Sequence, residues 1–160
     1  MQLIDEKKLD KIHNTLVKKG ETIAVAESVT TGLVQLALGQ AEKANEFYQG
    51  GLTTYNLGQK CRHLHIEPIH AEATNCVSEK VSKEMAIRIC ELFNSDWGIA
   101  VTGYATAVPE SGNKIFAFFS ISHHGKIVAK GKMTPPKKEG FDAQLYYVTT
   151  IIDRVLKLLT

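Results

Sequence analysis

The chain has 160 residues, of which 44% are hydrophobic and 22% are charged, and its formal net charge is +2. This composition is typical of a soluble globular protein, and we expect one domain over residues 1–160. The small charge and the scattered basic residues argue against a nucleic-acid-binding surface. No run of residues approaches the roughly 20 apolar positions of a membrane span, and no signal peptide is visible. We therefore expect a cytoplasmic protein without nucleic-acid or membrane partners.

The amino-terminal part of the chain predicts a helix, a strand and a second helix. Asp5 is a favourable N-cap, and the helix that it begins ends at the Lys-Lys-Gly sequence of residues 18–20. The apolar face of this helix consists of Leu9, Ile12 and Leu16. Residues 22–26 predict a buried strand, and a run of hydroxyl side chains separates it from a short helix at about residues 33–38.

The middle of the chain predicts a second strand at residues 50–55 and a short helix at residues 58–64. Residues 65–76 contain Pro68, and we expect them to form a loop. Ser78 then begins a helix with an apolar face. That face consists of Val81, Met85, Ile89 and Leu92.

The last part of the chain predicts three strands and a long helix. Residues 96–102 form an apolar strand, and residues 114–122 and 126–133 flank a turn and predict a hairpin. The final helix is expected from about residue 139 to residue 159. Helices that alternate with strands, together with one antiparallel pair, indicate an α/β fold. We expect a three-layer α/β/α sandwich with a mixed, mostly parallel sheet.

Polar residues follow three of the predicted strands. Glu27 and Ser28 follow the first strand, Tyr55 ends the second, and Thr102 and Gly103 end the third. The carboxyl ends of parallel strands meet at one edge of an open α/β sheet, which is where such folds bind ligands. Ser28 also precedes a helix amino terminus, whose N–H groups and dipole favour negative charge.

Lys60 lies about one helical turn beyond Tyr55, so its amine is able to reach the same crevice. A serine needs a neighbouring base to act as a nucleophile, and a lysine serves as that base when its pKa is depressed. Ser28, Lys60 and Tyr55 together therefore suggest acyl transfer, with backbone N–H groups holding the oxyanion. The simpler alternative is structural, because a serine before a helix is more commonly a cap and a single lysine is usually solvated.

Residues with metal-binding side chains occur close together in the middle of the chain, but their spacing does not favour a metal site. They are Cys61, His63, His65, His70 and Cys76. We expect no metal, and with Cys90 the three cysteines fit free thiols. His123 and His124 are expected at the tip of the hairpin, where no function is assigned to them.

Four segments resemble the CinA C-terminal family of competence/damage-inducible proteins. Residues 26–33 (Ala-Glu-Ser-Val-Thr-Thr-Gly-Leu) are similar to its AES-C-T-G-G-L motif. Residues 50–56 with Lys60 resemble its G-x-x-T-Y-S-N-x-x-K motif, residues 77–79 its A-V-S-E motif, and residues 99–103 its A-V-T-G motif.

The resemblance implies a three-layer α/β/α fold and deamidation of nicotinamide mononucleotide to nicotinate mononucleotide and ammonia, without a cofactor. Ser28 is then the nucleophile, and Tyr55 and Lys60 are its activating partners. The residues expected to contact the substrate are Glu27, Thr30, Thr31, Gly32, Thr102 and Gly103. The expected partner is a small molecule, a pyridine nucleotide or a related amide, and we expect a homo-oligomer.

Two positions and one loop depart from the family pattern. Thr31 replaces the first glycine of the family's Gly-Gly pair, and residues 104–110 replace a glycine-rich loop suited to phosphate. Ala143 stands where the family usually has an arginine. These changes leave two alternatives open beside the nucleotide amidase: a catalytically silent ligand-binding paralogue, and an amidase whose substrate carries no phosphate.

Overall fold

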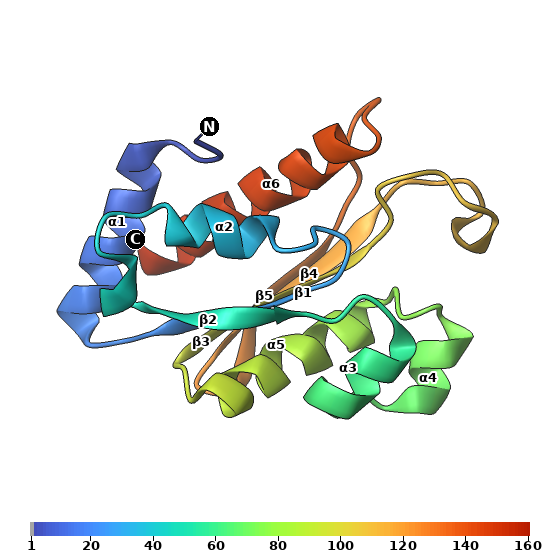
Figure 1. Ribbon diagram of the computed structural model, residues 1–160, viewed down its shortest axis with the longest axis horizontal. Helices are drawn as coiled ribbons and strands as arrows, with labels where there is room; N and C mark the ends of the chain where they lie inside the picture. Colours follow the sequence, from blue (N-terminus) through green and yellow to red (C-terminus); the bar gives the residue numbers. More distant parts are fainter. Residues whose placement is uncertain (1) are drawn as a thin grey trace.

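The five strands of the computed structural model, which describes residues 2–160, form one mixed sheet in the order β2-β1-β3-β4-β5 (Figure 1). They are β1 (Ile23–Glu27), β2 (Tyr48–Thr53), β3 (Trp97–Gly103), β4 (Ala117–His123) and β5 (Lys126–Met133). Strand β1 is parallel to β2 and β3, whereas β4 is antiparallel to β3 and β5. The α/β class is confirmed. Two strand pairs are parallel and two are antiparallel, so the expectation of a mostly parallel sheet is wrong. Both antiparallel pairs arise because the expected β4–β5 hairpin pairs with β3 through β4.

Helices lie on both faces of this sheet (Figure 1). They are α1 (Glu6–Lys19), α2 (Leu33–Gly39), α3 (Leu57–Leu64), α4 (Pro68–Ala73), α5 (Glu79–Phe93) and α6 (Phe141–Leu159), with the short 3₁₀ helices η1 (Ala44–Glu46) and η2 (Pro109–Ser111). Helices α1, α2 and α6 cover one face, and α3, α4 and α5 cover the other. Among the described residues, no helix has the length and apolar character needed to cross a bilayer.

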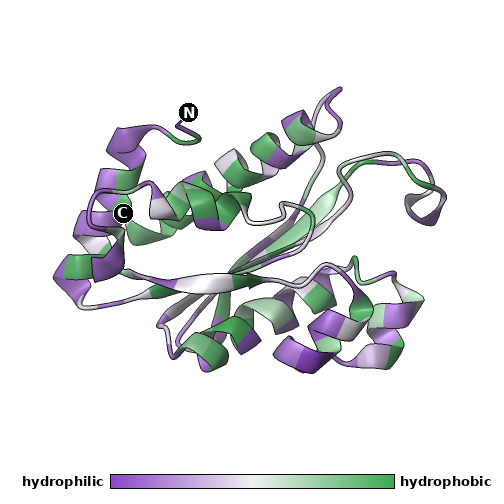
Figure 2. Ribbon diagram, in the orientation of Figure 1, coloured by the Kyte–Doolittle hydropathy of each residue, from purple (hydrophilic) through white to green (hydrophobic). Residues whose placement is uncertain are grey.

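Strand β1 contributes to a hydrophobic core on each side of the sheet because its side chains alternate between the two faces. Ile23 and Val25 pack with α1, α2 and α6, while the small residues Ala24 and Ala26 pack with α5. The apolar stripes of the long helices follow the same division (Figure 2). Gly98 on β3 lets α5 approach closely, since a Cβ there would lie 2.2 Å from the carbonyl oxygen of Ala86.

The predicted capping residues are confirmed at two helices. Asp5 accepts a hydrogen bond from the Lys7 N–H at 3.0 Å, and Gly20 closes α1 in the left-handed conformation. Ser78 accepts from the Val81 N–H at 3.1 Å at the start of α5.

The prediction of a loop over residues 65–76 is wrong, since this segment contains α4. Pro68 occupies the first turn of the helix, where the missing N–H costs nothing. Glu67 provides the cap, and its carboxylate accepts from the N–H groups of Ile69 and His70, both at 2.8 Å. Glutamate is not among the favoured N-cap residues, so the helix start had no clear sequence signal.

The turn between β1 and α2 holds a β-branched residue in an unfavourable backbone conformation. Thr31 is exposed and has a φ of 48°, in the left-handed region, and it is followed by Gly32 with a φ of 99°. A residue with a Cβ pays roughly 1–2 kcal/mol for this conformation. The family's glycine would relieve that cost at position 31.

We therefore expect the Thr31→Gly variant to be more stable than Thr31→Ala by about 0.5–1 kcal/mol, after the greater freedom of glycine in the unfolded chain is subtracted. Urea unfolding of both variants measures the difference. The matched control is the same pair of substitutions at Thr149, exposed on α6, where glycine should instead be less stable by about 1 kcal/mol. A glycine variant at position 31 less stable than the alanine variant would contradict the strain.

Candidate active site

The turn that carries Ser28 is held by the carboxylate of the preceding residue. Glu27 is fully buried at the end of β1, and both of its carboxylate oxygens accept hydrogen bonds from the start of α2. The donors are the Thr30 hydroxyl and the backbone N–H groups of Gly32 at 3.1 Å, Val34 at 3.1 Å and Gln35 at 2.7 Å. Four donors satisfy the buried charge, so Glu27 fixes the direction in which the turn leaves the sheet.

This arrangement changes the role expected of the α2 amino terminus. The sequence suggested that its N–H groups attract a substrate anion, but here they hold the carboxylate of Glu27. Thr30 is buried in the same cluster, and Thr31 donates its N–H to the Ser28 carbonyl at 3.1 Å. Within residues 2–160, the wall of the large pocket beside Ser28 contains none of Glu27, Thr30, Thr31 or Gly32. The contacts of these four residues hold the turn.

Lys60 reaches Ser28 from the opposite side of the crevice. It lies on α3, which follows β2 and is capped by the Asn56 side chain. Only 1% of Lys60 and 7% of Ser28 is exposed. The Lys60 Nζ lies 2.9 Å from the Ser28 Oγ and donates a 2.7 Å hydrogen bond to the Thr54 carbonyl oxygen. The two residues are 32 positions apart in the sequence, and the structure brings their reactive atoms into direct contact.

The surroundings of Lys60 disfavour its charged form. Burial lowers the pKa of its amine, and the nearby thiols of Cys76 and Cys61 only partly oppose this effect. No carboxylate in the described part of the chain lies within ion-pair distance of its Nζ. A buried amine with a lowered pKa and a serine hydroxyl at hydrogen-bond distance is the arrangement that a general base requires.

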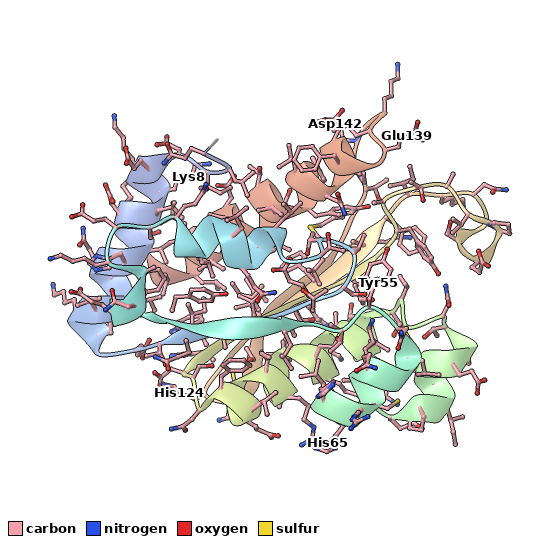
Figure 3. The ribbon with its side chains drawn as sticks, in the orientation of Figure 1. Lys8, Tyr55, His65, His124, Glu139 and Asp142 are labelled. Atoms are coloured by element: carbon pink, nitrogen blue, oxygen red, sulfur yellow. The ribbon has the colours of Figure 1, made fainter. Side chains whose placement is uncertain are left out.

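The contact between Ser28 and Lys60 lies at the base of a pocket of about 660 Å³. Tyr55 lines this pocket at its rim, where 68% of the residue is exposed, and its hydroxyl makes no hydrogen bond to Ser28 or Lys60 (Figure 3). Thr102 and Gly103 also line it. The structure thus gathers the three strand ends predicted from the sequence around one cavity, with Tyr55 further from the serine than the lysine is.

Thr102 and Gly103 have structural contacts of their own. The Thr102 hydroxyl donates to the Cys76 carbonyl oxygen at 2.7 Å. A Cβ on Gly103 would lie 2.4 Å from the Ala117 Cβ, so only glycine fits against β4 at this point. Both residues shape the floor of the pocket, and the backbone of Gly103 is open to it.

Several pocket residues had no signal in the sequence. Glu72 and Asn75 come from α4 and the turn after it, in the segment predicted as a loop. Phe141 and Gln144 come from the start of α6, more than 110 positions after Ser28. Gln144 donates to the Val29 carbonyl oxygen at 2.8 Å and so connects α6 to the serine turn. These residues meet only through the tertiary fold.

Ala143 does not lie where the sequence suggested. It is fully buried in the core on the side of the sheet that α1, α2 and α6 cover, and the neighbouring Gln144 lines the pocket instead. The altered loop does reach the pocket, through residues 104–106 and Val108. Lys60 and Glu72 are the charged residues of the described pocket wall.

Comparison with known proteins identifies the family. The family model described as the CinA C-terminal domain matches residues 5–132. A putative competence-damage inducible protein of Natranaerobius thermophilus is 38% identical over 118 residues, and a CinA-like protein of Prochlorococcus marinus is 36% identical over 110 residues. These alignments cover 73% and 69% of this chain but 28% and 26% of the relatives, so the chain spans about a quarter of their length.

Solved structures agree with the fold over the whole chain. The competence or damage-inducible protein of Enterobacter asburiae superposes with a TM-score of 0.91 at 26% identity, covering 100% of this chain and 99% of that one. A CinA superfamily protein of Escherichia coli superposes with a TM-score of 0.89 at 27% identity, covering 99% and 94%. The matched family model and these relatives together show that the chain belongs to the CinA C-terminal domain family.

Proposed function

We propose that this chain is a serine amidohydrolase that deamidates nicotinamide mononucleotide to nicotinate mononucleotide and ammonia. The observation that carries the proposal is the 2.9 Å contact between the Ser28 Oγ and the buried Lys60 Nζ at the base of the pocket. The substrate comes from the motifs that resemble the family. In this proposal Ser28 is the nucleophile and Lys60 the general base.

The first step forms a bond between the Ser28 Oγ and the carbonyl carbon of the amide, while the hydroxyl proton passes to the neutral Lys60 amine. The C–N bond then breaks, and the leaving nitrogen takes that proton as ammonia departs. Water attacks the resulting ester, with Lys60 accepting its proton, and the acid product leaves Ser28 restored. Lys60 alternates between base and acid, which requires a pKa near the working pH.

The oxyanion formed in each step needs hydrogen-bond donors close to Ser28. Two N–H groups of the turn are already engaged, since Thr31 bonds to the Ser28 carbonyl and Gly32 bonds to Glu27. The N–H group of Val29, which lines the pocket, is the donor that we assign to the oxyanion. Tyr55 lines the pocket, and we assign its phenol to substrate contact at the rim.

The phosphate of the nucleotide would lie at the start of α6. Gly140 and Phe141 line the pocket, and the amino terminus of this 19-residue helix has no side-chain cap. Its free N–H groups and its dipole favour an anion. This part of the wall lies beyond residues 5–132, the segment that matches the family model.

A second candidate is an unphosphorylated amide such as nicotinamide riboside. The observation that favours it is the charge of the pocket wall, which has Glu72 and no arginine. The cationic pyridinium ring is common to both substrates, but the carboxylate of Glu72 repels the phosphate of the nucleotide, and the neutral residues 104–106 offer that phosphate little.

The Ser28→Ala variant should lower ammonia release from nicotinamide mononucleotide by at least about 1,000-fold, because it removes the nucleophile. A coupled ammonia assay measures the rate, and near-ultraviolet circular dichroism checks the fold. Ser95→Ala, at the opposite end of the sheet, is the matched control and should keep the native rate. An unchanged rate in Ser28→Ala would contradict the mechanism. A native chain that binds the nucleotide without releasing ammonia would support the silent paralogue.

Comparison of kcat/KM for nicotinamide mononucleotide and nicotinamide riboside separates the two substrates. If α6 holds the phosphate, kcat/KM should be at least about tenfold higher for the nucleotide, a difference of about 1.4 kcal/mol in transition-state stabilisation. A higher kcat/KM for the riboside would reject the nucleotide as the preferred substrate. If Glu72→Gln also lowered kcat/KM for the riboside, the second candidate would be selected.

The lowered pKa of Lys60 also predicts how stability changes with pH. The unfolded chain binds a proton on this lysine up to pH values near 10.5, whereas the folded chain releases it at lower pH. The free energy of unfolding therefore gains a contribution that rises with pH between these two pKa values. Urea unfolding at several pH values should show that this rise is absent in Lys60→Met. The exposed-site control Lys11→Met should keep it, and equal pH profiles in all three proteins would contradict the lowered pKa.

A further inference from the structure

Two histidines and a glutamate come together at the end of the sheet opposite the pocket. Glu21 lies just before β1, and His123 and His124 lie at the turn between β4 and β5. One donor atom from each residue lies within 4.8 Å of the others. The Glu21 Oε1 is 3.1 Å from the His123 Nε2 and 3.6 Å from the His124 Nε2. Two imidazole nitrogens and one carboxylate oxygen therefore converge on one point.

These separations suit a transition-metal ion. Zinc is held by imidazole nitrogens and carboxylate oxygens at about 2.0–2.2 Å, which in tetrahedral geometry puts neighbouring ligand atoms roughly 3.3 Å apart. The observed 3.1 Å and 3.6 Å lie on either side of that distance. Two imidazoles and a carboxylate are borderline ligands that suit zinc and nickel better than magnesium or calcium.

Outer contacts hold the three side chains in place. The Trp97 Nε1 donates to the other oxygen of Glu21 at 2.6 Å, and the indole stacks on the His123 ring with centroids 3.9 Å apart. The Asp96 Oδ1 lies 3.6 Å from the His124 Nδ1, on the side of the ring away from Glu21. Carboxylates behind metal-binding imidazoles fix the tautomer and orient the ring.

The turn itself gives an independent reason to assign His124 a role. His123 pairs with Lys126, so His124 and Gly125 form a two-residue hairpin loop. Their φ angles are 48° and 75°, both in the left-handed region that favours Asn-Gly in such turns. Histidine is a less favourable choice than asparagine at this position, and its imidazole lies toward the Glu21 carboxylate.

We propose that Glu21, His123 and His124 bind one divalent transition-metal ion of the zinc and nickel class, with water completing its coordination. Residues 21 and 28 are separated by β1, about 23 Å of extended chain, and Figure 3 shows His124 and the pocket residue Tyr55 far apart. The ion therefore stabilises the fold by joining the start of β1 to the β4–β5 turn, and it takes no part in chemistry at Ser28.

Zinc titration of protein labelled with ¹⁵N-histidine tests the site residue by residue. The Nε2 resonances of His123 and His124 should shift together and saturate at one ion per chain. His13, whose Nε2 lies 2.9 Å from Glu46 without a second imidazole, is the matched control and should not shift with them. The thermal midpoint should rise with zinc and return when a chelator is added.

Two variants remove a ligand and keep the local structure. His124→Asn retains a residue that favours the left-handed turn, and His123→Phe retains the stacking on Trp97. Each should weaken zinc binding by at least about tenfold and abolish the thermal shift. Either folded variant is sufficient for the test. The proposal would be overturned if such a variant bound zinc with native affinity, or if zinc bound only through the cysteines or His13. A dissociation constant above about 1 mM for zinc in the native chain would also overturn it.

Discussion

A lysine amine buried without a carboxylate partner is the constraint on which the site depends. Lys60 is 1% exposed, and its Nζ contacts the Thr54 carbonyl oxygen and the Ser28 hydroxyl. Burying an unpaired ammonium is costly, so burial lowers the pKa of this amine and favours its neutral form. In the proposed function, this amine is the base for Ser28.

The second part of the site is the turn that presents Ser28. Its shape depends on Glu27, whose carboxylate occupies the α2 amino terminus and is satisfied by the donors of the turn. The N–H groups of Gly32, Val34 and Gln35 thus have a structural role, and the proposal assigns that of Val29 to the oxyanion. Gln144 adds a contact from α6 to the Val29 carbonyl, so the turn is held from both the strand side and the helix side.

The sequence predicted the elements with strong local signals. Helices α1 and α5 were found from their caps and apolar spacing, and the β4–β5 hairpin from its central turn. The proximity of Ser28, Lys60 and Tyr55 followed from the general rule that parallel strands end at one edge. Helix α4 was missed because Glu67 is an unusual cap, and the α6 wall was missed because Phe141 and Gln144 reach the pocket only through tertiary packing. Ala143 is buried in the core, while the next residue, Gln144, lines the pocket, because one position along a helix turns a side chain by about 100°.

Opposite ends of the sheet therefore have different chemistry: a serine and an amine at the carboxyl ends of the parallel strands, and a glutamate with two histidines at their amino ends. The central claim concerns the first, that Lys60 is able to act as a base for Ser28. The most direct test is the pH titration of the Lys60 side chain, followed by NMR of ¹³C-labelled lysine and assigned by loss of the signal in Lys60→Met. The account predicts a pKa below the ordinary 10.5, because burial disfavours the charged amine. A midpoint at or above 10.5 would contradict it.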